Sequence, residues 1–416
     1  MWLGTRGSLE EAIVARRGLP FKSVPSGPVV GTNPLQLAWN ALRIAAGIAV
    51  AWRAMRVGRR VADAGSPARP DVVFVTGGYV CVPVAIAAKL RRIPLAVYLP
   101  DVKPGKAVDF IARLADKIAV TAESAVPYLP AGKAVVTGYP VRPAIRTLER
   151  GVARRRLGLN LTAPVLLVFG GSQGARRLNR AVAGAAERLL AHLEIVHVAG
   201  QKEYERAKAL WATLPVRLAT RYHLYEYLHD EDMTAGLAAA DLVVSRAGAA
   251  TLGEFPARGL PAILVPLPIS GGHQIPNARV LTDAGAALFV EDGLLDADRL
   301  VADVNRLLGD PDKMDRMRQA ARGLDAPEAA DKIGALLVEL ASAGTPGAAG
   351  ATGAAGITGA TGTSRTSGTS ETSGTSGTSE TPETSETSES TGTHGRTPAK
   401  SKEKEAAQWY WPYRKS

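Results

Sequence analysis

The stretch DLVVSRAGAATLGEFPARGLPAILVPLPISGGHQIPNARVLTDAGAA, residues Asp241–Ala287, decides the fold. Its β-branched run Leu242–Val244 has the composition of a buried strand, and a turn at Ser245–Gly248 leads into an Ala-rich helix. A second apolar run, Ala262–Val265, is followed by a Gly-Gly loop and another helix start. Two adjacent strand–loop–helix units are typical of a parallel α/β sheet, which binds ligands at the carboxyl ends of its strands.

The side chains of this stretch suit a nucleotide-sugar. A helix start offers free N–H groups and a positive dipole end to a phosphate, and Gly248 lets the backbone approach an anion. Glu254 falls in the first turns of its helix, where the carboxylate could accept hydrogen bonds from a ribose diol. Gln274 and Asn277 share one helix face and could bind sugar hydroxyls. Each residue alone also fits a structural role as dipole partner or helix cap, but together they favour ligand binding.

The bulk composition predicts two ordinary domains followed by a low-complexity tail. The 416-residue chain is 46% hydrophobic, which supports sizeable cores. The formal charge is +11, and residues 343–416 carry seven basic and seven acidic side chains, so the excess charge belongs to the rest of the chain. That balance favours an anionic partner, either a phosphate-bearing substrate or an acidic lipid surface. No zinc-finger or RNA-binding pattern accompanies it, so nucleic acid is not an expected partner.

Cysteine usage and the N-terminus bear on the compartment. A single cysteine, Cys81, excludes an intrachain disulfide and fits a reducing cytoplasm, and no signal-peptide pattern is visible. The most apolar helix candidate, Leu35–Val57, is interrupted by one asparagine and three arginines, so it falls short of the roughly 20 apolar residues of a membrane span. Two interpretations of this helix stay open: a core helix whose terminal cations complement its dipole, or an amphipathic helix resting on anionic lipid.

The N-terminal part also alternates strands with helices. Trp2–Gly4 is typical of a strand end, and Ser8–Arg16 of a helix with Glu11 in the capping-box position. A chain that opens on what resembles a second strand suggests that a first strand is missing. Further strands are expected at the start of 71–92 and at 93–99, 117–122 and 134–139. We expect a first Rossmann-like domain over residues 1–141.

A second domain is expected over residues 142–342. Its first strand, Val165–Phe169, leads into GGSQGARRLN, which lacks the spacing of a Walker loop or a dinucleotide fingerprint. Two more strands are predicted at Glu194–Val198 and Arg217–Ala219. A last helix begins near Pro327 and could pack back on the first domain. Residues 343–416 are Gly/Ser/Thr-rich and are expected to be disordered.

Four stretches then line up: TGGYVCVPVAIAA, VVTGYPVRP, VFGGSQGARRLN and SRAGAATLGEFPARGLPAILVPLPISGGHQIPNA. Together they resemble the MurG family, bacterial N-acetylglucosaminyltransferases of peptidoglycan precursor synthesis, over nearly everything from Leu3 to Leu340. The resemblance implies a GT-B fold with two Rossmann-like domains facing a cleft. It also implies inverting transfer of N-acetylglucosamine from its UDP donor to lipid I. The product would be lipid II, made by a peripheral protein at the cytoplasmic face of the cell membrane.

The same resemblance implies where the donor's uracil and diphosphate bind. Gly171 and Ser172 match the donor-phosphate loop. Arg142 matches the family's donor-binding arginine in the hinge. Leu228 matches a backbone contact to uracil, although its spacing to Met233 is longer than in the family.

Residues that follow the central strands match the donor's ribose and sugar contacts. The segment from Ala249 through Thr251 to Glu254 corresponds to the ribose-binding run, with Glu254 on the ribose hydroxyls. Gln274 and Asn277 correspond to the donor-sugar contacts. Neither a metal ion nor another cofactor is implied, because helix N-termini and an arginine would stabilise the leaving diphosphate.

Two departures from the family fall on the acceptor side. The family's N-terminal GGTGGH-type loop is absent, and its HEQN motif reads YLPD here, with Asp101 at the asparagine position. Asp101 is the ionisable group in that motif and becomes the candidate general base. The departures leave two alternatives open: a related glycosyltransferase with another lipid acceptor, or a truncated or mis-started chain that binds UDP-sugar without turnover.

Overall fold

The computed structural model describes residues 1–28, 33–55, 69–171, 175–268 and 272–343. The chain divides into a first unit, Met1–Ala348, and a second unit, Ala349–Ser416, and the description below concerns the first. Ser172 and nearly all of the predicted disordered tail lie outside the described residues.

A first lobe is built on a four-stranded parallel sheet of order β3-β4-β5-β6. Two more parallel strands, β1 and β2, form a separate sheet. The strands are β1 Trp2–Gly4, β2 Phe21–Ser23, β3 Val73–Val75, β4 Leu95–Leu99, β5 Lys117–Val120 and β6 Ala134–Val136. The helices are α1 Leu9–Arg16, α2 Pro34–Ala54, α3 Cys81–Leu90, α4 Lys106–Leu114 and the 3₁₀ helix η1 Glu123–Tyr128.

A second lobe contains a six-stranded parallel sheet of order β12-β11-β10-β7-β8-β9. Its strands are β7 Val165–Phe169, β8 Glu194–Val198, β9 Tyr222–Tyr225, β10 Leu242–Ser245, β11 Ala262–Leu264 and β12 Ala287–Phe289. The helices before and within it are α5 Pro143–Thr147, α6 Arg150–Arg156, α7 Arg176–Leu190, α8 Tyr204–Trp211, α9 Val216–Ala219, α10 Asp230–Ala239, α11 Thr251–Arg258, α12 Gln274–Asp283, η2 Asp292–Leu294, α13 Ala297–Leu308 and α14 Pro311–Gly323.

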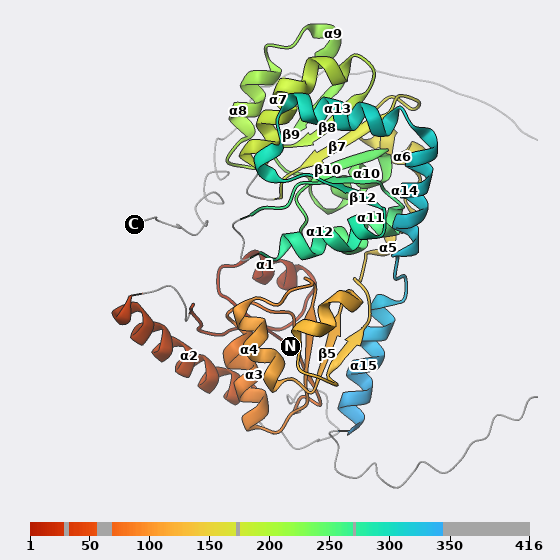
Figure 1. Cartoon of the computed structure of the whole chain (residues 1–416). Helices are drawn as coiled ribbons and strands as arrows, with labels where there is room; N and C mark the ends of the chain where they lie inside the picture. The colour runs from red at the N-terminus through yellow and green to blue at the C-terminus, as the bar shows by residue number, and fades with distance from the viewer. Residues whose placement is uncertain (29–32, 56–68, 172–174, 269–271, 344–416) are drawn as a thin grey trace, which may run out of the picture. The chain divides into compact units, whose positions relative to one another are not determined.

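The pleat of this second sheet divides its core into two halves. Leu166 and Val168 pack with α7 and α13 on one face, whereas Leu167 packs with α10 and α11 on the other. Figure 1 shows these helices on opposite sides of the sheet. Successive side chains of a strand point to opposite faces, so a strand covered by helices on both sides must be apolar throughout. This is why the run Val165–Phe169 could be assigned to a strand from sequence.

Asp241, the first residue of the fold-deciding stretch, fixes the start of β10. Its Oδ2 accepts a hydrogen bond from the Val165 amide at 2.9 Å and another from the Arg154 Nη2 at 2.9 Å. Arg154 is a guanidinium only 1% exposed, so its charge needs this carboxylate. The pair therefore ties α6 to the two central strands of the second lobe.

The last helix, α15 (Ala329–Ala343), packs on the first lobe. Its Ile333 and Leu336 contact Tyr98 and Ala119 of β4 and β5. The helix lies beside β5 in Figure 1. The chain thus passes between the lobes twice, once after β6 and once between α14 and α15.

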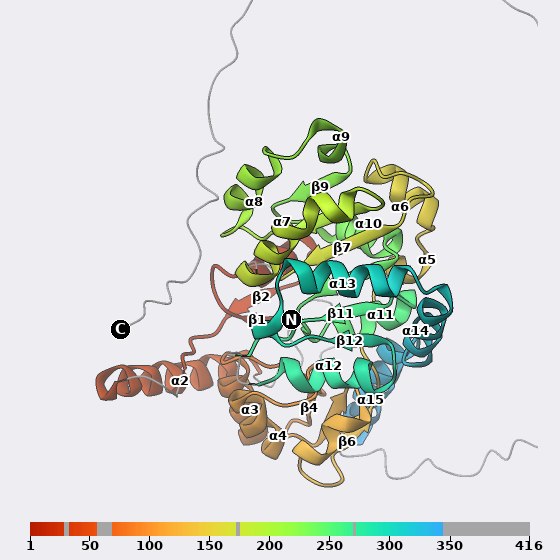
Figure 2. The same cartoon turned by 45° about the horizontal axis from the view of Figure 1, so that its top comes forward.

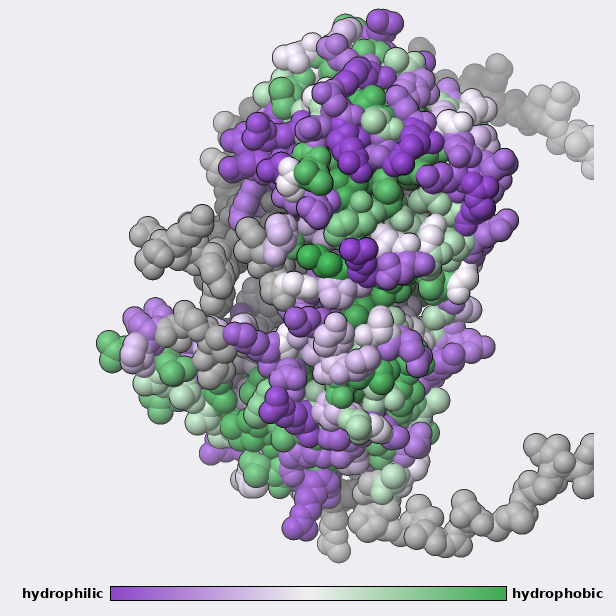
Figure 3. Space-filling model, in the orientation of Figure 1, coloured by the Kyte–Doolittle hydropathy of each residue, from purple (hydrophilic) through white to green (hydrophobic). Residues whose placement is uncertain are grey.

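The helix α2 is held at one end and exposed at the other. Gly47, in its second half, lies so close to Pro25 that an added Cβ would be 2.1 Å from the Pro25 carbonyl oxygen. Its first turns carry Leu35, Trp39 and Leu42, which are 82%, 64% and 64% exposed. Figures 1 and 2 show this end extending away from α3, and Figure 3 shows hydrophobic surface along it. By length and composition α2 could also cross a membrane, since it carries only Arg43 and Arg53 as charges.

One strand prediction was wrong. Arg217–Ala219 belongs to the short helix α9, and the strand that pairs with β8 is β9, a few residues later. The fixed φ of Pro215 suits the position just before a helix, and the backbone amides of Leu218 and Ala219 both bond to its carbonyl oxygen. The sheet edge is therefore made by the aromatic run Tyr222–Tyr225.

We expect acid to destabilise the second lobe through His197. The ring is fully buried between Tyr222 Oη at 2.6 Å and Asn179 Oδ1 at 3.1 Å, and burial lowers its pKa from 6.5 to about 4. Between these values the unfolded chain binds more protons than the folded one, so stability falls as pH drops, by about 3 kcal/mol for this group. Urea unfolding across this range should show that fall, and His197→Gln should reduce it. An unchanged pH slope in His197→Gln would contradict the assignment; exposed His192→Gln is the control.

Candidate functional site

The carboxyl end of β7 forms the glycine turn that the sequence singled out. An added Cβ at Gly170 would lie 2.3 Å from the Ala175 Cβ, so no larger residue fits there. Gly171 has φ +86°, in the left-handed region that favours glycine. Both observations explain the Gly-Gly pair, which turns the chain sharply towards α7. Ser172, the next residue, lies outside the described residues.

The neighbouring turn after β10 is held by a buried arginine. Arg246 Nη1 donates to the Val265 carbonyl oxygen at 2.9 Å and pairs with Asp292 at 2.6 Å. These contacts join the ends of β10 and β11 to the segment after β12. Thr251 Oγ1 donates to the Gly248 carbonyl oxygen at 2.7 Å, which orders the first turn of α11. The space beside the Gly248 Cα is open, so the turn presents free backbone there.

Glu254 and Arg142 lie within electrostatic reach of each other. Burial raises the pKa of Glu254, the positive charge of Arg142 opposes that rise, and Asp230 adds to it. Arg142 also pairs with the exposed Asp230 at 3.2 Å. The carboxylate that the sequence assigned to a ribose thus feels the charge of the cation assigned to a diphosphate, although one follows β10 and the other β6.

Tyr139, just after β6, lies within electrostatic reach of these charges, and the sequence interpretation gave it no role. Burial raises its pKa, Glu254 and then Asp101 raise it further, and Arg142 lowers it. Its ring packs against α11, where an added Cβ at Gly253 would be 2.5 Å from it. The signal available in the sequence was its position directly after a strand end, where side chains reach the cleft.

Asp101 and Asn277 meet across the two lobes. Asn277 Nδ2 donates to Asp101 Oδ1 at 2.8 Å and to the Ala247 carbonyl oxygen at 3.1 Å. Asn277 Oδ1 accepts from the Val102 amide at 2.9 Å. Asp101 follows β4 of the first lobe, whereas Asn277 is on α12 of the second. Two residues predicted for different substrates are therefore in direct contact.

The remaining predicted residues occupy different surroundings. Gln274 Oε1 accepts a hydrogen bond from the Leu267 amide at 2.8 Å, so the side chain holds the loop before α12. Leu228 is buried in the core beside α10, which leaves its backbone rather than its side chain for a ligand. Ala249 is half-buried at the start of α11. These three contacts with a donor stay predictions.

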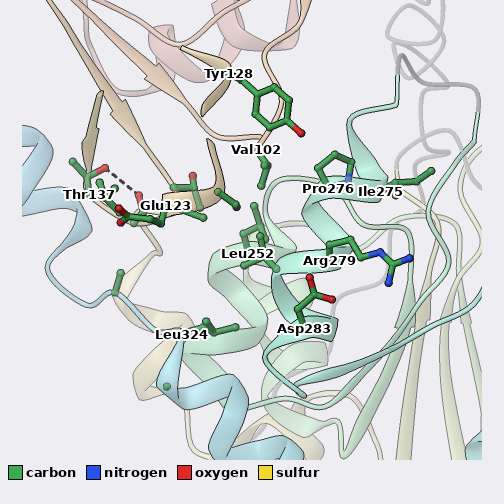
Figure 4. A pocket seen from close by; sticks show the side chains of 18 of the residues that line it. Val102, Glu123, Tyr128, Thr137, Leu252, Ile275, Pro276, Arg279, Asp283 and Leu324 are labelled. Atoms are coloured by element: carbon green, nitrogen blue, oxygen red, sulfur yellow. Dashed lines mark hydrogen bonds between the residues drawn. The ribbon is translucent and has the colours of Figure 1, made fainter. Parts of the chain in front are cut away.

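Two cavities flank the start of α12. One, of about 800 Å³, contains Gln274 and Gly170 and is lined by arginines on α7. The other, of about 730 Å³, lies between η1 of the first lobe and α11 and α12 of the second (Figure 4). Its walls include Glu123, Leu252 and Arg279, but neither Arg142 nor Glu254. Of the donor residues that were predicted from sequence and that the structure describes, Gln274 alone lines the first cavity, and none lines the second.

Among the residues that the structure describes, no three His, Cys, Asp or Glu side chains come together to form a metal site. The groups available to meet a leaving anion there are backbone amides at helix starts and guanidinium groups.

Both lobes match models of one class of enzyme. Residues 1–120 match the glycosyltransferase family 28 N-terminal domain, and residues 165–333 match the C-terminal domain of the same family. The class defined by fold and site is therefore a glycosyltransferase with two Rossmann-like lobes.

More specific relatives identify the family. The chain is 40% identical to the UDP-N-acetylglucosamine–N-acetylmuramyl-(pentapeptide) pyrophosphoryl-undecaprenol N-acetylglucosamine transferase of Roseiflexus sp., over 82% of this chain and 83% of that protein. It is 38% identical to the corresponding Desulforudis audaxviator transferase, over 83% of this chain and 91% of that protein. The crystal structure of Acinetobacter baumannii MurG is similar with a TM-score of 0.60 at 26% identity, covering 81% of this chain and 90% of that one. The chain belongs to the MurG family, and the predicted GT-B fold is confirmed.

Proposed function

We propose that the protein transfers N-acetylglucosamine from UDP-N-acetylglucosamine to the lipid-linked muramyl pentapeptide, lipid I, and so forms lipid II for peptidoglycan. The observation that carries the proposal is the match to transferases of this name along more than four fifths of both chains. The cluster of Arg142 and Glu254 at strand ends supports a site for the UDP half of that donor.

The reaction is a displacement at the anomeric carbon of the donor sugar. The acceptor's 4-hydroxyl oxygen forms the new bond while the bond to the UDP oxygen breaks, so the configuration inverts and UDP leaves with the electron pair. Asp101 accepts the hydroxyl proton, since it is a carboxylate at the end of β4 within electrostatic reach of Tyr139 in the donor cluster.

The leaving diphosphate gains charge as the bond breaks. Backbone amides at the Gly170–Gly171 turn and at the start of α11 offer hydrogen bonds to phosphate oxygens, and Arg142 supplies a positive charge. Glu254 accepts hydrogen bonds from the ribose diol. Gln274 is the proposed contact to the donor sugar.

Turnover with purified substrates is the direct test. UDP-N-acetylglucosamine and lipid I should give UDP and lipid II. Mass spectrometry of the lipid fraction measures the lipid II formed. A second lipid acceptor, such as diacylglycerol, should give no glycosylated product in the same assay. Absence of lipid II, or preference for the second lipid, would overturn the proposed reaction.

We further propose that the protein acts as a peripheral protein at the cytoplasmic face of the membrane, with α2 resting on an anionic lipid surface. The exposed first turns of α2 carry Leu35, Trp39 and Leu42, and Arg43 and Arg53 lie on the same helix. Tryptophan and leucine insert at the headgroup boundary, while arginine interacts with anionic headgroups. In this proposal the acceptor's lipid and the first lobe share one surface.

Removing the apolar end of α2 should weaken membrane binding. Trp39→Ala with Leu42→Ser should lower partitioning into anionic vesicles by about 10- to 100-fold, because two large side chains no longer enter the interface. Vesicle sedimentation measures the effect. The matched control is Trp211→Ala with Leu210→Ser, another exposed pair on α8 of the second lobe. Equal binding by both double variants would contradict the role of α2.

A further inference from the structure

We infer that Asn277 is a positioning residue that holds the Asp101 carboxylate at the donor site, a role that rests on the proposed function of Asp101. The two residues are 176 positions apart in sequence and belong to different lobes. Asn277 therefore links formation of the catalytic arrangement to the contact between the lobes.

The hydrogen bonds of Asn277 define this role. One amide hydrogen goes to Asp101 Oδ1 at 2.8 Å and the other to the Ala247 carbonyl oxygen at 3.1 Å. The side-chain oxygen accepts from the Val102 amide at 2.9 Å. Ala247 lies in the turn after β10, so Asn277 connects the donor-side turn of the second lobe with two successive residues of the first.

These contacts leave Asn277 little capacity for a sugar. Both of its N–H groups are used within the protein, and the residue is 0% exposed. A carboxamide has two donor hydrogens, so a donor-sugar hydroxyl could meet only the remaining lone pair of Oδ1. In this arrangement Asn277 orients the base, and its predicted contact with the donor sugar would require these bonds to rearrange.

A neighbouring contact holds the same loop. His273 Nδ1 lies 2.9 Å from the Lys103 carbonyl oxygen, and the His273 ring lies 3.7 Å from where a Cβ on Gly105 would be. Val102 is buried with 2% exposure. Three successive residues after β4 are thus fixed by the start of α12. This restraint leaves the Asp101 carboxylate little freedom to move from its position.

Kinetics of Asn277→Ala test the assignment. Misplacing a catalytic group by about 1 Å can cost on the order of 100-fold in rate, so kcat should fall roughly 30- to 100-fold, while KM for UDP-N-acetylglucosamine should change less than about threefold. In an Asp101→Asn background, Asn277→Ala should cause no further fall in kcat, because the group being positioned is already inactive. A large rise in donor KM, or effects that multiply, would overturn the inference in favour of direct sugar binding.

An exchange of the two side chains separates positioning from chemistry. Asn277→Asp sets two carboxylates against each other and should lower the melting temperature. Asp101→Asn combined with Asn277→Asp restores an amide–carboxylate pair, so its melting temperature should rise above that of Asn277→Asp. It should stay below that of the wild type, because the Ala247 carbonyl oxygen has lost its donor. Turnover should stay as low as in Asp101→Asn. The control is Asn179→Ala, a buried asparagine bonded within the second lobe, which should lower stability with kcat unchanged.

The exchange also distinguishes failure of the inference from failure of the proposed function. If the wild-type protein made no lipid II, the proposed reaction would fall, yet recovery of melting temperature in the exchanged variant would still establish the contact. If the changes in melting temperature of the two single variants simply added in the double variant, and if kcat did not depend on residue 277, the positioning role would be refuted. The proposed transferase function would not be affected by that result.

Discussion

Asp101→Asn is expected to reduce turnover by about 10²- to 10⁴-fold, the range that a positioned general base contributes. The amide keeps the size of the carboxylate, and its oxygen can still accept the hydrogen bond from Asn277 Nδ2. It cannot take a proton from the acceptor hydroxyl. The loss should therefore appear in kcat, with UDP affinity by calorimetry changed less than about threefold.

A matched substitution in the same lobe controls for the change of charge. Asp109→Asn, on α4, removes an exposed carboxylate that pairs with Arg113 at 3.1 Å. Its kcat should equal that of the wild type. Near-normal turnover in Asp101→Asn would exclude Asp101 as the general base. Tyr139 or a group of the acceptor itself would then be the next candidate.

Glu254→Gln is expected to weaken UDP binding by about 10- to 100-fold, because hydrogen bonds to a charged group contribute about 1.5–3 kcal/mol. The same change should leave the free protein as stable as before or more stable. Burial raises the pKa of the Glu254 carboxyl, which means that its charged form is disfavoured in the fold. Calorimetric titration with UDP and urea unfolding together measure the two opposed effects.

The pH dependence provides a second check on Glu254. A carboxyl with a raised folded-state pKa binds more protons when folded, so its contribution to stability improves as pH falls through that pKa. UDP affinity should change in the opposite direction, since the ionised form accepts the ribose hydrogen bonds. Glu254→Gln should remove both trends, whereas Glu123→Gln, which lines the cavity beside η1, should retain them. Wild-type UDP affinity in Glu254→Gln would exclude Glu254 from the ribose site.

Much of the second lobe could be predicted because its strands are buried on both faces. Val165–Phe169 and Glu194–Val198 are continuous apolar or mostly apolar runs whose ends the structure reproduces. Arg217–Ala219 could not be assigned from composition, since Pro215 and the pairing of β9 decide that region. The local sequence pattern predicted strands correctly where both faces of the strand are buried. It gave a wrong strand assignment near the edge of the sheet.

Individual residues of the candidate site could be predicted from the sequence, but the contacts between them could not. The turn glycines and Glu254 follow strands, and strand ends in a parallel sheet share one edge. The pairing of Asn277 with Asp101 depends on how the two lobes meet, which no spacing in the sequence encodes. Tyr139 was missed for the same reason, since two of the charges that shift its pKa, Glu254 and Asp101, belong to two other segments of the chain.

The double passage of the chain between the lobes has a mechanical consequence. The two crossings touch, because an added Cβ at Gly138, whose φ is +87°, would lie 2.2 Å from the Ala326 Cβ. Two adjacent connections resist sliding of one lobe past the other and separation of the lobes. Rotation of one lobe about the connections is then the motion that costs the least free energy. The two lobes should therefore open and close by a hinge motion about this pair of crossings. A side chain at position 138 would force the two crossings apart there.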